Sequence, residues 1–222
     1  MTPTEREFLR SSKFLSEFSE ETADAIVKAS VMKEFADREA VQKKGKKGDG
    51  IFVVLSGALI FSTVSASGDE VSVGCLRPGD WAGDLSSIDG GGRTHDAHAI
   101  GLTRVAWLNT TRISELSLKF PDFYRILINM LCYSVRATYD EFDKILMFST
   151  EQMLAWRISY FFENVQKGEE IPLRQDDMAA LVGVSRQTIN SILRRWSAEG
   201  IIETRYGHIQ LHNPKKLRAM FN

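Results

Sequence analysis

A run of polar side chains between Gln175 and Trp196 (QDDMAALVGVSRQTINSILRRW) is the stretch of this chain best suited to recognising another molecule. Ser185 can cap a helix by accepting hydrogen bonds from the free backbone N–H groups of its first turn. Five polar or basic side chains follow this cap: Arg186, Gln187, Asn190, Ser191 and Arg194. In the DNA major groove, Arg pairs with guanine edges and Gln with adenine edges. We therefore predict that Ser185 and these five residues contact double-stranded DNA.

To present that face, the stretch must fold as two short helices joined by a tight turn. Its apolar residues are spaced so that each helix buries one side: Met178, Ala179, Val182, Val184, Ile189 and Ile192. The small Ala179 lets the helices approach, and Gly183 supplies the turn because glycine reaches left-handed backbone angles at no steric cost. An ordinary helical hairpin with a solvated face is the alternative. The small residue, the turn glycine, the cap and the base-reading side chains together favour a helix-turn-helix.

The charge of the chain is distributed unevenly. The 222 residues carry a formal net charge of −1, and the region from Met1 to Phe148 holds 18 Lys and Arg against 21 Asp and Glu. From Arg186 to Arg218, seven basic residues stand against two acidic ones, a local net charge of +5. A solvated charged surface would explain this excess equally well on its own. Beside the predicted helix pair, it indicates contact with phosphates.

The first half of the chain contains short β-rich runs separated by turn signals, after two short amphipathic helices within residues 4–29. Turn signals such as Ser56-Gly57 and Ser67-Gly68-Asp69 recur at regular intervals, which is typical of an all-β barrel or sandwich. A barrel of this size can hold one small ligand. The predicted strands are Ile51–Leu55, Ala58–Val64, Val71–Leu76, Ala97–Leu102 and Arg104–Leu108.

A long helix is predicted from Pro121 to about Met147. Its apolar side recurs every seven residues, which is typical of a coiled-coil seam. A helix of this length is too long for a small barrel to cover, so we expect it to pair with its copy in a second chain; packing on its own domain is the alternative. Thr138 is a polar residue in the seam and needs a hydrogen-bond partner. The seam residues are Ile128, Leu131, Val135, Thr138, Phe142 and Ile145.

The C-terminal region is predicted to surround the helix pair with further elements. A helix begins at Ser149 or Thr150 and runs through about Gln166, and a loop at residues 167–170 and a short extended piece at 171–173 follow it. Beyond the helix pair, Ile201–Thr204 and His208–Leu211 predict a β-hairpin that can rest on DNA as a wing, and Pro214 starts a short basic helix. The resulting domains are 1–120, 121–148 and 149–222.

In this order, the predicted elements and the motifs GVSRQTINSIL and LRPGDWAGDL resemble the CRP/FNR family of bacterial transcription regulators. The resemblance implies an α+β fold with an N-terminal double-stranded β-helix, or jelly-roll, barrel of the cyclic-nucleotide-binding type. A long dimerisation helix and a C-terminal winged helix-turn-helix follow the barrel. It also implies a homodimer on a two-fold symmetric operator that responds to a signal, with RNA polymerase as a further partner and no enzymatic activity. Arg194, Arg195, Lys215 and Lys216 are expected to meet phosphates or solvent.

The resemblance also indicates where a signal molecule would bind. Cyclic-nucleotide binders of the family carry Gly-Glu-Leu and, further on, Arg-Ser/Thr-Ala; this chain has Gly83-Asp84-Leu85 and Arg93-Thr94-His95 there. Thr138 and Tyr139 fall where the family's adenine-contacting residues fall. Asp in place of Glu, His95 in place of Ala, and the run Gly90–Gly92 depart from the pattern. The identity of the effector therefore stays open: it could be a cyclic nucleotide such as cyclic AMP, another small ligand or haem, or there could be no ligand at all. A small-molecule sensor module whose DNA-binding domain is inactive also stays open.

Other classes of function lack support in the sequence. Cys75 and Cys132 form no Cys-x-x-Cys pair, so zinc ribbons and iron–sulfur clusters are not expected. Asp96 and His98 share a strand face but supply only two metal ligands, and the spacing of Cys75, His95 and His98 singles out no axial haem ligand. We expect no catalytic constellation, signal peptide or membrane-spanning run. We expect an intracellular, cytoplasmic protein with reduced cysteines.

Overall fold

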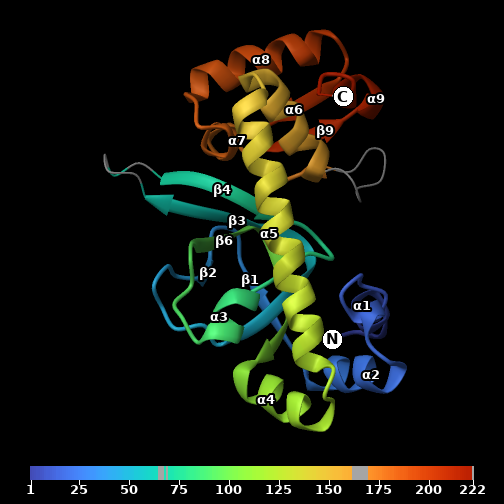
Figure 1. The fold of residues 1–222 in the computed structure, drawn as a ribbon. Helices are drawn as coiled ribbons and strands as arrows, with labels where there is room; N and C mark the ends of the chain where they lie inside the picture. Colours follow the sequence, from blue (N-terminus) through green and yellow to red (C-terminus); the bar gives the residue numbers. More distant parts are fainter. Residues whose placement is uncertain (65–67, 69, 162–169, 222) are drawn as a thin grey trace. The chain divides into compact units, whose positions relative to one another are not determined.

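The computed structural model describes residues 1–64, 68, 70–161 and 170–221 and divides the chain into two compact units (Figure 1). The first unit comprises Met1–Phe61 and Cys75–Thr138, and the second comprises Ser62–Gly74 and Tyr139–Asn222. The long helix α5, Phe123–Met147, contributes residues to both. The fold is α+β, with a β domain, one long helix and a C-terminal helical domain that carries a small sheet.

The six-stranded sheet of the β domain has the strand order β1-β6-β3-β4, with β2 paired to β6 and β5 paired to β3. Strands β1 and β6 run antiparallel, with Val31 opposite Trp107 and Phe35 opposite Thr103. The strands are β1 (Val31–Phe35), β2 (Ala40–Gln42), β3 (Gly50–Val64), β4 (Glu70–Leu76), β5 (Trp81–Ala82) and β6 (Asp96–Asn109). The short strands β1, β2 and β5 were not predicted, because none of them has a strong alternating pattern of its own.

The predicted break at Ser56-Gly57 is wrong, because β3 runs through it without interruption. Gly57 has φ +75° and bends the strand, and a Cβ there would lie 2.4 Å from Oγ1 of Thr103. That hydroxyl donates to the Ala58 carbonyl at 3.0 Å, so β3 and β6 stay paired across the bend. The predicted strands of residues 97–102 and 104–108 are likewise one strand, β6. Of the predicted turn at residues 67–69, only Gly68 lies among the described residues.

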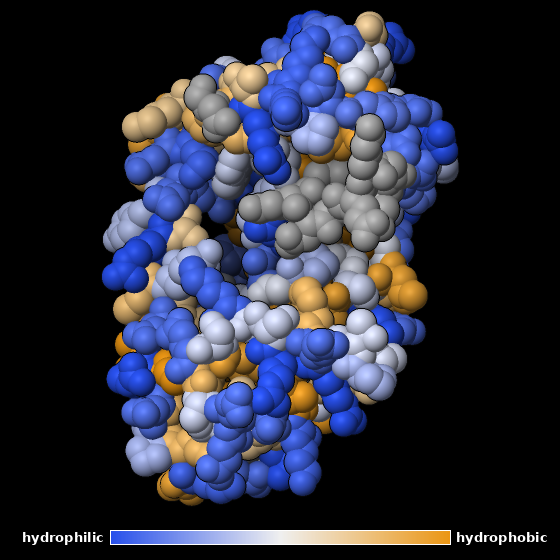
Figure 2. Space-filling view, turned by 90° about the vertical axis from the view of Figure 1, so that its right-hand side faces the viewer, coloured by the Kyte–Doolittle hydropathy of each residue, from blue (hydrophilic) through white to orange (hydrophobic). Residues whose placement is uncertain are grey.

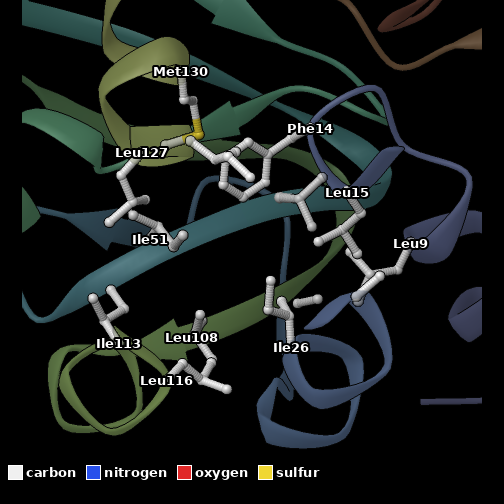
Figure 3. Close-up of a cluster of buried hydrophobic side chains, with 14 of the residues drawn as sticks. Leu9, Phe14, Leu15, Ile26, Ile51, Leu108, Ile113, Leu116, Leu127 and Met130 are labelled. Carbon is white, nitrogen blue, oxygen red and sulfur yellow. The ribbon is translucent and has the colours of Figure 1, made fainter. Parts of the chain in front are cut away.

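Helices pack onto the β domain through a core assembled from distant parts of the chain (Figure 3). Helix α1 (Pro3–Arg10), a 3₁₀ turn (Leu15–Glu17) and α2 (Glu20–Ala29) form the N-terminus, and α4 (Thr110–Lys119) precedes α5. Fully burying a Leu or Ile side chain contributes about 1.5–3 kcal/mol. The core residues labelled in Figure 3 are Leu9, Phe14, Leu15, Ile26, Ile51, Leu108, Ile113, Leu116, Leu127 and Met130.

Helix α5 is buried only on one side of its first half, through Phe123, Ile126, Leu127 and Met130. Most of the residues predicted to form the seam are exposed in the single chain: Ile128 by 50%, Val135 by 44%, Phe142 by 56% and Ile145 by 57%. Leu131 is half-buried. The Thr138 hydroxyl donates to the Ser134 carbonyl one turn earlier at 2.9 Å, so its partner lies on its own helix.

In the second unit, the helices enclose a three-stranded antiparallel sheet of order β7-β9-β8. Its elements are α6 (Thr150–Phe161), β7 (Glu170–Ile171), α7 (Gln175–Val182), α8 (Arg186–Ala198), β8 (Ile202–Arg205), β9 (His208–Leu211) and α9 (Pro214–Arg218). The predicted hairpin is therefore present, with β7 as a third strand. The predicted end of the first helix near Gln166 and the loop at 167–169 lie outside the described residues.

Candidate functional site

The helix pair α7 and α8 forms as its residues require. Gly183 ends α7 with φ +73°, and its N–H donates to the Ala179 carbonyl at 2.9 Å. Ser185 caps α8 by accepting from the Thr188 N–H at 3.2 Å. The buried faces include Met178, Ala179, Ile189 and Ile192 as predicted. Val182 and Val184 are only half-buried; Leu181, Leu193 and Trp196 are buried instead.

The predicted reading side chains of α8 lie on its outer face. Ser185, Arg186, Gln187, Ser191 and Arg194 are exposed, and Asn190 is half-buried. Nη1 of Arg186 lies 3.6 Å from Oδ2 of Asp176, and both side chains are about two-thirds exposed. An ion pair this exposed is worth about 1 kcal/mol or less, so it can open when another partner is offered.

Several basic residues near α8 already have acidic partners within the second unit. Arg195 pairs with Glu151 at 2.6 Å and Lys216 with Glu199 at 2.7 Å. Arg205 pairs with Glu170 at 2.8 Å. The local excess of positive charge counted along the sequence is therefore partly offset by Glu151, Glu170 and Asp176, which lie outside the counted stretch. Among the described residues, Arg194 and Lys215 make no ion pair.

Glu151 fixes α8 against α6. It accepts hydrogen bonds from the indole Nε1 of the fully buried Trp196 at 2.8 Å and from Arg195. Burial of Glu151 would raise its pKa, but the hydrogen bonds from Arg195 and Trp196 and the charge of Arg195 outweigh burial and lower the pKa. The contact therefore orients the C-terminal half of α8, while the polar side chains of its N-terminal half face solvent.

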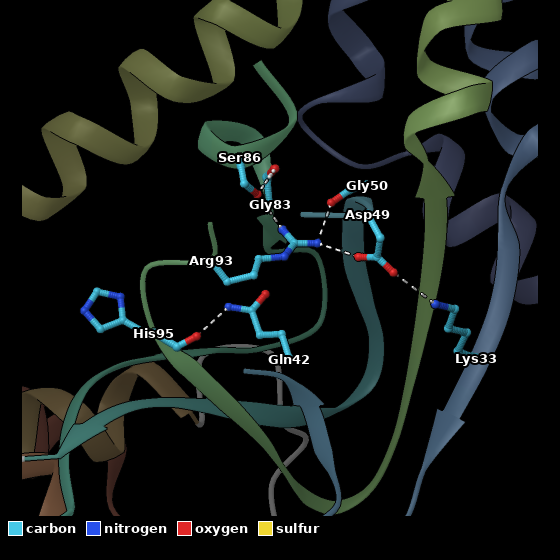
Figure 4. Close-up of polar contacts among 8 residues, drawn as sticks. All are labelled: Lys33, Gln42, Asp49, Gly50, Gly83, Ser86, Arg93 and His95. Carbon is cyan, nitrogen blue, oxygen red and sulfur yellow. Dashed lines mark hydrogen bonds and ion pairs between the residues drawn. The ribbon is translucent and has the colours of Figure 1, made fainter. Parts of the chain in front are cut away.

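In the β domain, the buried Arg93 is the centre of a network of hydrogen bonds (Figure 4). Its Nη2 donates to Oδ1 of Asp49 at 3.0 Å and to the Gly50 carbonyl at 2.8 Å. Its Nη1 donates to Oγ of Ser86 at 3.0 Å. Arg93 is 5% exposed, and its guanidinium is held in one place by these three contacts. We call Arg93, Asp49, Gly50 and Ser86 the Arg93 network.

Gly83 and Asp84 lie directly against this network at the start of the short helix α3 (Asp84–Asp89). Gly83 has φ +92°, and a Cβ there would lie 2.5 Å from both Nη1 of Arg93 and the Gly50 carbonyl oxygen, so no other residue fits. Asp84 is 8% exposed, and its Oδ2 accepts from the hydroxyl of Ser134 on α5 at 2.9 Å. The structure therefore places Gly83 against Arg93 and joins Asp84 to Ser134, which is 50 residues further along the chain.

The remaining predicted effector residues are more exposed. Leu85 is 41% exposed, and the exposed Thr94 lies with its Oγ1 3.0 Å from Nδ1 of His95. Burial of His95, and then the nearby charge of Lys44, lower the pKa of His95. Thr138 and Tyr139 are exposed on α5, and Tyr139 belongs to the second unit.

Sequence reasoning missed the partners that hold these groups. Asp49, Ser86 and Ser134 were not singled out as functional residues. The buried Arg157 of α6 was also missed; it pairs with Glu141 of α5 within the second unit. A charged residue among apolar ones, such as Arg157, was the one available signal that a buried ion pair was present.

The described part of the chain contains neither a clustered set of metal ligands nor a membrane-spanning helix. No group of three or more His, Cys, Asp or Glu residues there is placed to hold a metal ion. Cys75 is half-buried, Cys132 is exposed, and neither forms a disulfide. Among the described residues, no helix is both long and apolar enough to cross a membrane. Hydrophilic residues dominate the face drawn in Figure 2, with hydrophobic ones scattered among them.

The second unit contains the capped outer helix α8, its supporting helix α7 and an adjoining three-stranded sheet. This arrangement is a winged helix-turn-helix DNA-binding domain. Residues 152–220 match the Crp-like helix-turn-helix domain, and residues 32–119 match the cyclic nucleotide-binding domain. The chain belongs to the CRP/FNR family of transcription regulators, which bind DNA and are not enzymes.

Relatives of similar length support this assignment. The chain is 23% identical over 190 residues to the CRP-like cAMP-activated global transcriptional regulator of Mycobacterium tuberculosis, covering 83% of this chain and 85% of that protein. It is 23% identical over 177 residues to the cyclic AMP receptor protein of Thermus thermophilus, covering 80% and 82%. The structure of FixK2 from Bradyrhizobium japonicum has a TM-score of 0.74 at 16% identity, covering 87% of this chain and 98% of that one. At this identity, the similarity to FixK2 shows the fold alone.

Proposed function

We propose that this DNA-binding regulator acts as a homodimer on a two-fold symmetric operator in the cytoplasm, together with RNA polymerase, and that a small molecule in the β domain controls it. Residues 1–120 would sense the signal, 121–148 would pair the chains and 149–222 would bind DNA. The exposed polar face of α8 carries the proposal. Its Arg186 is two-thirds exposed and its only charged partner among the described residues is an equally exposed carboxylate.

The exposed apolar side of α5 supports the homodimer. Ile128, Val135, Phe142 and Ile145 are each at least 44% exposed in the single chain, which is unusual for a soluble surface of this composition. Two chains paired along this side would place two copies of α8 so that they read half-sites one helical turn apart. Sedimentation analysis tests this step: a monomer at micromolar concentration would contradict it, and Phe142→Glu should shift a wild-type dimer towards monomer.

DNA reading is tested by selecting operators from a pool of random duplexes. We expect the wild-type protein to enrich one symmetric sequence, with an affinity that falls steeply as salt rises. Ser185, Arg186, Gln187, Asn190, Ser191 and Arg194 are the proposed contacts. Arg186→Ala should relax the preference for one guanine in each half-site, by about 1–3 kcal/mol. An unchanged preference in this variant would remove Arg186 from the reading face.

The effector is proposed to bind at Gly83, Asp84, Leu85, Arg93, Thr94, Thr138 and Tyr139. Arg93 is held in place by its three hydrogen bonds and is followed in the sequence by the exposed Thr94. An Arg together with a hydroxyl donor suits an anionic group such as a phosphate. Two of the relatives respond to cyclic AMP by name, so cyclic AMP is the first candidate. Thermal shift in the presence of cyclic nucleotides tests this, with Thr94→Ala as the variant because its exposed side chain can be removed without disturbing the Arg93 network.

A ligand-independent regulator is the second candidate function. Three N–H groups of Arg93 already bond to protein atoms, and Asp84 accepts from Ser134 rather than pointing its carboxylate at solvent. If no cyclic nucleotide changes the melting temperature, and the purified protein binds its selected operator without any addition and shows no visible haem absorbance, this second function is supported instead.

A further inference from the structure

The hairpin of β8 and β9 ends in an aromatic residue that no other described residue covers. Tyr206 and Gly207 form the two-residue turn between Arg205 and His208, which face each other across the hairpin. The Tyr206 side chain is fully exposed, with a relative accessibility of 103%. An exposed aromatic ring contributes no hydrophobic burial to the stability of the fold. We therefore take the ring as a candidate contact for another molecule.

The tip of this hairpin lies beside the start of α7, which in turn contacts the reading end of α8. A Cβ on Gly207 would lie 3.9 Å from Cγ of Arg174, the residue that caps the N-terminus of α7. The next two residues of that turn, Gln175 and Asp176, lie 3.5 and 3.6 Å from the guanidinium nitrogens of Arg186 at the start of α8. One helical turn of α7 therefore separates Arg186 from the tip that carries Tyr206.

Arg205, the cation at the end of strand β8, already has acidic partners. Nη1 of Arg205 lies 2.8 Å from Oε1 of Glu170, and its Nε lies 3.0 Å from Oε1 of Glu203. His208 directs its Nδ1 to the Tyr206 carbonyl at 3.1 Å. Arg205 therefore adds little positive charge of its own, and the most exposed group of the turn is the flat apolar ring of Tyr206.

We infer that Tyr206 packs its ring against the sugars of the minor groove that flanks the half-site read by α8. With α8 in the major groove, a neighbouring hairpin tip reaches the adjacent minor groove, whose walls are formed by the sugars and accept apolar side chains. The contact is non-ionic, so it adds affinity without releasing counterions. This inference rests on the proposed DNA reading by α8.

The experiment measures the affinity of wild type, Tyr206→Ala and Tyr206→Phe for the operator selected by the wild-type protein. Each is measured over a range of salt on two duplexes, one with long flanks and one that ends at the outer edge of the half-sites. Leu118→Ala is the control, because Leu118 is 88% exposed on α4 and also loses an exposed apolar side chain. Melting temperatures should not change in any of these variants, since the side chains are exposed.

On the long duplex, we expect Tyr206→Ala to bind about tenfold more weakly than wild type, and Tyr206→Phe to bind within about twofold of it. The salt dependence should be unchanged, and the loss should disappear on the short duplex. Equal binding by Tyr206→Ala and wild type on the long duplex would overturn the inference, as would a loss that persists on the short duplex. A loss in Tyr206→Phe as large as in Tyr206→Ala would assign the contact to the hydroxyl and overturn packing by the ring.

These outcomes separate the inference from the function on which it rests. If the wild-type protein enriches no sequence and binds neither duplex, the proposed function fails and the role of Tyr206 fails with it. If wild type binds its operator and Arg186→Ala relaxes the preference while Tyr206→Ala binds normally, only the role of Tyr206 is wrong.

Discussion

The face of α8 and the Arg93 network both present arginine and hydroxyl groups, but the protein holds them in opposite ways. The side chain of Arg186 is 64% exposed and is paired with one exposed carboxylate. The side chain of Arg93 is 4% exposed and donates to Asp49, Gly50 and Ser86. The first arrangement leaves a donor available to a new partner at little cost. The second fixes a donor in place and makes it part of the fold.

The largest expected effect on stability comes from comparing Gly83, beside the Arg93 network, with Gly183, in the turn before α8. Gly83→Ala places a methyl group 2.5 Å from Nη1 of Arg93 and from the Gly50 carbonyl, so the Arg93 network must move apart. We expect a loss of about 3 kcal/mol or more in the free energy of unfolding, measured by urea denaturation. Gly183→Ala is the matched control, because Gly183 also has a positive φ but no atom lies within 4 Å of its Cβ position.

Gly183→Ala should therefore cost only about 1 kcal/mol, the strain of a left-handed alanine. Equal losses in the two variants would show that backbone strain alone decides both, and that the Arg93 network can yield at little cost.

A second comparison removes the two arginines themselves. Arg93→Met should lower the free energy of unfolding by about 2 kcal/mol, because Ser86 and the Gly50 carbonyl lose a buried donor while the exposed Asp49 is resolvated. Arg186→Met should change it by about 0.5 kcal/mol or less, since the side chain is on the surface. The same chemical denaturation measures both. A substantial loss of stability in Arg186→Met would mean that the reading face also supports the fold.

This contrast also explains which parts of the structure could be predicted from the sequence. The helix pair follows from local rules: Gly183 ends one helix, Ser185 caps the next, and alternate faces are apolar or polar. All of these signals lie within a few residues of one another. The identity of the exposed side chains of α8, and the family to which they point, could therefore be read directly.

The Arg93 network and the neighbouring Asp84–Ser134 hydrogen bond could not be predicted, because they join separate parts of the chain. Asp49 and Arg93 are 44 residues apart, and Asp84 and Ser134 are 50 apart. Neither pair produces a periodic pattern, and the resemblance to the family pointed to Arg93 and Asp84 only as ligand-binding groups. Strand boundaries failed for a related reason: Gly57 resembles a turn locally, but Thr103 of β6 keeps the strand paired.

A third prediction tests how readily Arg186 leaves its partner. Asp176→Asn removes the carboxylate that competes with DNA for Arg186, so we expect operator affinity to rise by about two- to fivefold. The gain should shrink at high salt, because the exposed pair is already screened there. Asp122→Asn is the control, since Asp122 forms an exposed pair with Arg125 in the first unit and its replacement changes net charge equally. A similar gain in both variants would show a general charge effect and not release of Arg186.

The smallest expected effect concerns pH and the contact that fixes the buried side of α8. The pKa of Glu151 is lowered in the folded protein, because the hydrogen bonds from Arg195 and Trp196 and the charge of Arg195 outweigh burial, which acts to raise it. The unfolded chain therefore takes up the proton at higher pH than the folded one. The stabilisation is complete above the ordinary pKa of a glutamate and is lost as the pH falls through the lower folded value.

Glu151→Gln should accordingly be less stable than wild type at neutral pH by about 1 kcal/mol or less, because the side chain is partly exposed to solvent. That difference should shrink as the pH falls to about 3, since protonation removes the same charge from the wild-type protein. Thermal unfolding of both proteins across this range measures it. A difference in stability that stays constant across this pH range would mean that Glu151 holds Trp196 through its shape and hydrogen bonding alone. The inward face of α8 would then be insensitive to charge, whereas DNA binding by the Arg186 face is expected to depend on charge.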